Sequence, residues 1–215
     1  MRAILRRELV VMGAQPGITA AIALHVGATL AFLLAWNQGV PLLPGTNVYE
    51  QLQVIEPWLL VVLLSWTAAR CLAPERGDRM VLLSVLAAVP PSRIILARTI
   101  AVVVVLALVV AAAFPVVVIA QQMSAVPIRT AVTSLVPLLG LVVLIAAIAT
   151  AWTVAAAERL AAWIGSALTS GLLLVILPHA FLPHLVDGIV WALTGVSITF
   201  VLAAWSDGAL RYCHE

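Results

Sequence analysis

The chain has 215 residues, of which 64% are hydrophobic and 9% are charged, and its formal net charge is +2. Soluble domains carry a charge on about a quarter of their residues, so this chain has too few charges to cover itself with a surface suited to water. The small net charge gives no support for binding to nucleic acid. The composition predicts a protein whose solvent is lipid.

Continuous apolar segments, most of them near the roughly 20 residues that cross a bilayer, predict an all-α membrane protein with six transmembrane helices. We expect a single transmembrane domain over residues 1–215. The predicted spans are, in chain order, Ile18–Trp36, Pro57–Leu72, Ile94–Ala120, Ala131–Ala157, Leu160–Leu177 and Gly188–Trp205.

The first segment, residues 1–16, is short and amphipathic rather than continuously apolar. Its apolar side chains recur at helical spacing, and its arginines fall between them. This pattern predicts a helix that lies along the membrane surface and contacts the lipid. The apolar face consists of Ile4, Leu5, Leu9 and Met12, and the polar face of Arg2, Arg6 and Arg7.

The arginines also orient the predicted spans. With the N-terminus inside, only Arg129 falls on the outer side, and positive charge gathers on the cytoplasmic side of membrane proteins. The chain is therefore expected to be a multi-pass protein of the cell (inner) membrane with both termini in the cytoplasm. The cytoplasmic set is Arg2, Arg6, Arg7, Arg70, Arg76, Arg79, Arg93, Arg98, Arg159 and Arg211.

Two of the outer connections in this topology have a distinctive sequence. Residues 37–56 contain the helix-breaking residues Pro41, Pro44 and Gly45, with Glu50 and Glu56 as the only charges. Residues 177–187 hold two Pro-His pairs separated by apolar residues. The second connection has two interpretations that the sequence leaves open: a re-entrant turn that enters the outer leaflet, or an ordinary short loop.

The longest cytoplasmic connection, residues 74–93, reads PERGDRMVLLSVLAAVPPSR and opens with the densest cluster of charges in the chain, Glu75, Arg76, Asp78 and Arg79. Asp78 is a plausible N-cap for a short helix that Pro90 and Pro91 would stop. Acidic residues near its start suit the helix dipole. Such a helix would either rest on the lipid surface or dock into a groove of a cytoplasmic protein.

Candidate sites within the spans are few. His25 is the one histidine clearly inside a span, and it has either a structural role or a role in contacting substrate. Ser166 and Ser170 are further candidates for a pathway, although small residues in spans also mark close helix packing. We expect no catalytic residue, no metal site and no bound cofactor in this chain, and it contains no phosphate-binding loop with which to hydrolyse ATP.

The segment between the second and third spans resembles that of the permeases of type-2 ABC exporters. It opens with Glu-Arg-Gly, continues with a Leu-Leu pair and closes with Pro-Ser-Arg, and an RRE-containing amphipathic helix precedes the first span. The matching positions are Glu75, Arg76, Gly77, Leu82, Leu83, Pro90 or Pro91, Ser92 and Arg93.

The resemblance implies a membrane permease without enzyme activity of its own. Residues 74–93 would form the coupling helix that docks on a cytoplasmic ABC ATPase, which would bind ATP and magnesium. A second permease, identical or homologous, would complete the pathway. The expected coupling residues are Glu75, Arg76, Gly77, Asp78, Arg79, Leu82, Leu83, Ser92 and Arg93.

The sequence is also compatible with two other functions. One is a membrane anchor or a haem-bearing subunit of an electron-transfer complex. To hold haem, His25 and an outer histidine would have to lie at similar depth. The other is a structural scaffold for other membrane proteins.

Overall fold

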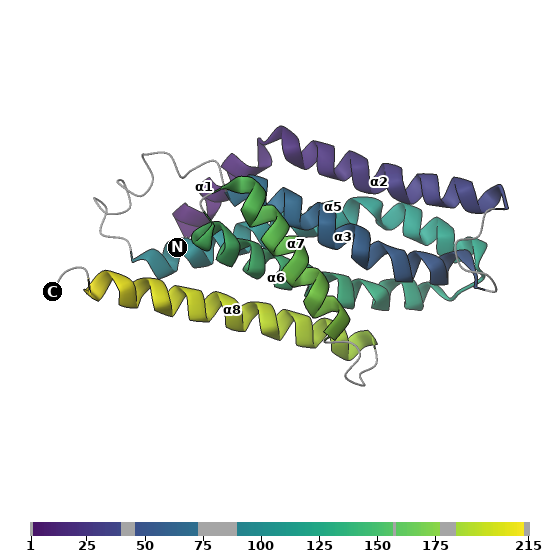
Figure 1. The fold of residues 1–215 in the computed structure, drawn as a ribbon. Helices are drawn as coiled ribbons and strands as arrows, with labels where there is room; N and C mark the ends of the chain where they lie inside the picture. The colour runs from purple at the N-terminus through teal and green to yellow at the C-terminus, as the bar shows by residue number, and fades with distance from the viewer. Residues whose placement is uncertain (1, 40–45, 73–89, 157, 177–183, 213–215) are drawn as a thin grey trace.

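The computed structural model describes residues 2–39, 46–72, 90–156, 158–176 and 184–212, and these residues form helices and no strand. Seven helices make up this described part of the chain (Figure 1). Their bounds are α1 Arg2–Gly13, α2 Pro16–Asn37, α3 Val48–Leu72, α5 Pro91–Met123, α6 Ile128–Ala155, α7 Arg159–Ile176 and α8 His184–Tyr212.

Among the described residues, six helices are long and apolar enough to cross a membrane. They are α2, α3, α5, α6, α7 and the part of α8 from Gly188 to Ser206. The chain is thus a multi-pass, all-helical membrane protein, and this coarse prediction from the sequence is confirmed.

The bundle has an inner and an outer group of helices. α3, α5 and α6 lie in the middle, α2 and α8 flank them on opposite sides, and α7 crosses over α6 (Figure 1). α6 packs against α3, α5, α7 and α8, whereas α2 packs against α3 and α5. The largest core cluster accordingly draws on α3, α5 and α6, with leucine, valine and alanine as its main residues.

Prolines lie at the starts of some helices and in the interiors of others. Pro16 and Pro91 occupy the first positions of α2 and α5, where a helix needs no backbone N–H donor. Pro57, Pro115 and Pro137 lie inside α3, α5 and α6. Each of these removes one backbone hydrogen bond and gives its helix a place to bend.

Glycines bring α6 and α8 together along their length. A Cβ added to Gly188 would lie 2.6 Å from the Cα of Pro137, and one added to Gly195 would lie 2.8 Å from the carbonyl oxygen of Val143. A Cβ on Gly140 would collide with the backbone of Gly188. The two backbones therefore touch directly, as small residues allow in membranes.

α3 begins well before the predicted span, at Val48 instead of Pro57. α8 begins at His184, and its candidate span, Gly188–Ser206, starts where the sequence predicted. Residues 48–56 are therefore not part of an outer connection. The reason is that Val48, Tyr49 and Leu52 share one helical face and pack against Val116 and its neighbours on α5, which outweighs the polar residues between them.

Candidate functional site

Most of the predicted coupling segment lies outside the described residues. This applies to Glu75, Arg76, Gly77, Asp78, Arg79, Leu82 and Leu83. The last two members, Ser92 and Arg93, lie in the first turn of α5 and not in a loop, and Arg93 is exposed. Within the connection of residues 177–187, positions 177–183 are likewise outside the described residues, and 184–187 begin α8.

The start of α5 is tied to α1. The Nε of Arg98 lies 3.7 Å from the Oε2 of Glu8, whose side chain is 3% exposed against 24% for Arg98. α1 packs on α5, and Leu5, Leu9 and Met12 of α1 contact the main core cluster. α1 and the turn of α5 that follows the predicted coupling segment thus form one connected unit.

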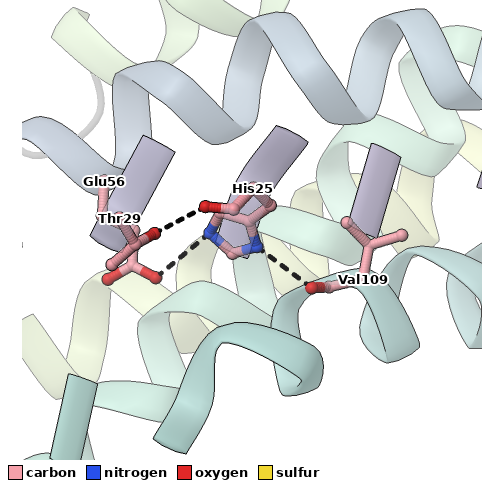
Figure 2. Close-up of polar contacts among 4 residues, drawn as sticks. All are labelled: His25, Thr29, Glu56 and Val109. Atoms are coloured by element: carbon pink, nitrogen blue, oxygen red, sulfur yellow. Dashed lines mark hydrogen bonds and ion pairs between the residues drawn. The ribbon is translucent and has the colours of Figure 1, made fainter. Parts of the chain in front are cut away.

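His25, in the middle of α2, is fully buried and faces both α3 and α5 (Figure 2). Its Nδ1 lies 3.0 Å from the backbone carbonyl oxygen of Val109 in α5. Thr29, one turn later, donates its hydroxyl to the carbonyl oxygen of His25 at 2.7 Å, which satisfies that hydroxyl within its own helix.

Glu56 of α3 faces the other ring nitrogen of His25, Nε2. Its Oε1 lies 3.6 Å from Nε2 of His25, and the Glu56 side chain is 2% exposed (Figure 2). Its second oxygen, Oε2, is buried without a hydrogen-bond partner. Because α2, α3 and α5 each supply one group, the three helices meet at a polar site inside the membrane-spanning part of the fold. We call this contact, made by His25, Glu56 and the carbonyl of Val109, the His25–Glu56 site.

Sequence reasoning missed Glu56 because it placed this residue in an outer connection. The signal that could have found it is the helical spacing of Val48, Tyr49, Leu52 and Ile55, which extends the second span toward the N-terminus. His25 was singled out correctly as a membrane-embedded polar residue. Its Nδ1 contacts the carbonyl oxygen of Val109, whereas its Nε2 faces Glu56 without a hydrogen-bond partner.

The two candidate serines lie elsewhere. Ser166 of α7 is fully buried and donates its hydroxyl to the Oγ of Ser65 in α3 at 3.3 Å. Ser170, one turn along α7, is also fully buried, and its hydroxyl has no hydrogen-bond partner. Since Glu56 and Ser65 are nine positions apart, they project from opposite faces of α3. His25 and Ser166 therefore contact opposite faces of the same helix and do not form one site.

The described part of the chain shows no candidate metal site. No group of three or more His, Cys, Asp or Glu residues is placed to hold a metal ion there. Comparisons of the chain with models of known families, with curated proteins and with solved structures find no match.

Proposed function

We propose that the chain is the membrane-spanning permease subunit of an ATP-driven ABC exporter and that a separate cytoplasmic ATPase supplies the energy. The observation that carries the proposal is the link between the predicted coupling segment and the bundle. The last residues of this segment, Ser92 and Arg93, form part of the first turn of α5, and the Glu8–Arg98 ion pair connects the first turns of α5 to α1. A push on that segment would therefore move α1 and α5 together.

Charge distribution supports this proposal. α1, the end of α3 and the start of α5 lie at one end of the bundle (Figure 1). The exposed arginines Arg2, Arg6, Arg7 and Arg70 belong to this end. The positive-inside rule assigns such an end to the cytoplasm, where a soluble ATPase can reach it. α1 would then lie at the headgroup level, with its arginines toward water.

The mechanism would be a rigid-body movement of helices. Closure of two ATPases would bring the coupling segments of two permeases together and switch the paired bundles between two arrangements. The substrate would pass between the permeases, along α2, α3 and α7. A single chain of this kind supplies half of the pathway, so a homodimer or a heterodimer with a second permease is part of the proposal.

Replacement of both Glu75 and Arg76 by alanine tests the proposal. The chain is expected to purify from its native membrane with a soluble ATPase, and the double variant is expected to lower the ATPase activity of that complex about tenfold, because losing roughly 1.4 kcal/mol of docking energy has this effect. Phosphate release from the complex is the measurement.

Arg129→Ala is the matched control. Arg129 is exposed near the start of α6, at the end of the bundle opposite α1, and its removal should leave ATPase activity unchanged. A stable native complex that contains no ATPase would contradict the proposal. So would equal ATPase activity in the double variant and the parent.

A further inference from the structure

The contacts of the two ring nitrogens of His25 indicate how many protons the His25–Glu56 site holds. A backbone carbonyl oxygen can only accept a hydrogen bond, so Nδ1 of His25 must carry the proton in its 3.0 Å contact with Val109. In a neutral ring, Nε2 then carries a lone pair and no proton. This lone pair faces Oε1 of Glu56 at 3.6 Å.

Two lone pairs that face each other repel, so a further proton belongs between Nε2 and Oε1. The proton resides on either atom: a neutral imidazole then faces a carboxylic acid, or an imidazolium faces a carboxylate. Both forms hold the same number of protons and have no net charge. Removing this proton would leave one negative charge among fully buried groups, and adding another would leave one positive charge, which burial disfavours in both cases.

In the part of the chain that the structure describes, no other charged side chain lies close enough to the site to hold this proton or to balance its loss. α2 packs against α3 and α5, and α5 presents only apolar side chains from Ile100 to Phe114. On α3, Glu50 is exposed and lies almost two turns before Glu56. Within the described residues, Glu56 is therefore the titratable side chain that His25 meets.

We propose that His25 and Glu56 form a binding site for a single proton, which holds α2 against α3 and α5. Separation of α2 from α3 would let water reach the pair. The bond that holds the proton, O–H of Glu56 or N–H at Nε2, would then break and the proton would pass to water. The electron pair of that bond would stay on Glu56 or on Nε2, so that a carboxylate and a neutral ring remain in both cases. Closing the helices would reverse these steps and take one proton up.

Two features of α3 favour such an exchange. Pro57 directly follows Glu56 and interrupts the backbone hydrogen bonds of the helix at this point, so α3 can bend there. Gln53 lies three positions earlier on the same side of the helix, and its buried amide nitrogen has no hydrogen-bond partner. This donor is available to the carboxylate once the proton has left.

The test compares the pH dependence of Tm for the full chain in detergent with that of Glu56→Gln. At pH 8 the unfolded chain has an ionised glutamate and a neutral histidine, so the folded chain holds one more proton than the unfolded chain. Its stability must fall as pH rises. The amide group that Glu56→Gln introduces still donates to Nε2 but exchanges no proton. Between pH 7 and 9 the parent Tm should fall more steeply than that of the variant, by up to about 4 °C per pH unit.

Two additional variants complete the design. Glu50→Gln removes an exposed carboxylate from the same helix and should keep the parent slope. Glu56→Leu removes the acidic group that faces Nε2 and should lower Tm by about 4 °C at pH 7, because the buried Nε2 then faces only apolar atoms. Parallel slopes for the parent and Glu56→Gln would overturn the proposal. Nitrogen-15 NMR of His25 together with the infrared carboxyl band gives an independent answer, since a neutral ring beside an ionised Glu56 at pH 7 would also overturn it.

Discussion

Gly188→Val is expected to lower Tm by about 9 °C, which corresponds to roughly 3 kcal/mol for a chain of this size. The new side chain would have to enter space held by the backbone of α6: its Cβ alone would lie 2.6 Å from the Cα and 2.7 Å from the nitrogen of Pro137. Backbone atoms cannot rotate away as a side chain can. α8 would therefore have to move off α6 and lose the contacts along the rest of the interface, including the close approach at Gly195.

Gly27→Val is the control for this variant. Gly27 lies in the interior of α2, and a Cβ there would meet no atom within 4 Å. Both variants carry the same cost of placing a β-branched residue in a helix. Thermal unfolding followed by size-exclusion chromatography measures the difference between them. Equal Tm values would show that the α6–α8 contact does not contribute to stability.

Arg98→Ala is expected to release α1 from the bundle and to lower Tm by about 6 °C. Glu8 is almost fully buried beside Arg98, so removing the arginine takes away the cation that faces a buried carboxylate. Losing one partner of a buried pair costs about 3–5 kcal/mol, and the partial exposure of Arg98 reduces this to about 2 kcal/mol. Faster proteolysis within residues 2–13 would report the release of α1 directly.

Arg93→Ala provides the comparison for Arg98→Ala. Arg93 lies five positions earlier on α5 and is exposed, so its removal should change neither Tm nor the cleavage of α1. Glu8→Gln should behave like Arg98→Ala, but with a smaller loss, because the amide oxygen can still accept from Arg98. An α1 that stays protected in Arg98→Ala would mean that the apolar contacts of Leu5, Leu9 and Met12 hold it without the ion pair.

The helices that could be predicted from the sequence are those that consist of an unbroken apolar run. α2, α5, α6 and α7 begin and end within a few residues of the predicted spans, because an unbroken apolar run fixes where a helix can cross lipid. The start of α3 could not be predicted in this way. Its first turns mix apolar residues with Gln51 and Glu56, which a search for apolar runs reads as a loop.

The polar contacts depend on partners far apart in the chain, and for this reason the sequence did not reveal them. Glu8 stood out only as one charge in a surface helix, and nothing in its neighbourhood pointed to Arg98. Likewise, His25 could be recognised as unusual, but its two partners are contributed by helices that begin later in the chain. Periodicity gives the face of each helix, whereas tertiary packing decides which faces meet.

The His25–Glu56 site also has a consequence for how the protein is made. Among the six candidate spans, α3 has the lowest mean hydropathy, 1.5, against 2.1 for α2 and 3.2 for α5. An unpaired carboxylate deep in a span hinders insertion by the translocon. Because α2 is synthesised first, His25 already lies in the membrane when Glu56 emerges from the ribosome. We expect α2 and α3 to enter the bilayer as a helical hairpin, onto which α5 then docks.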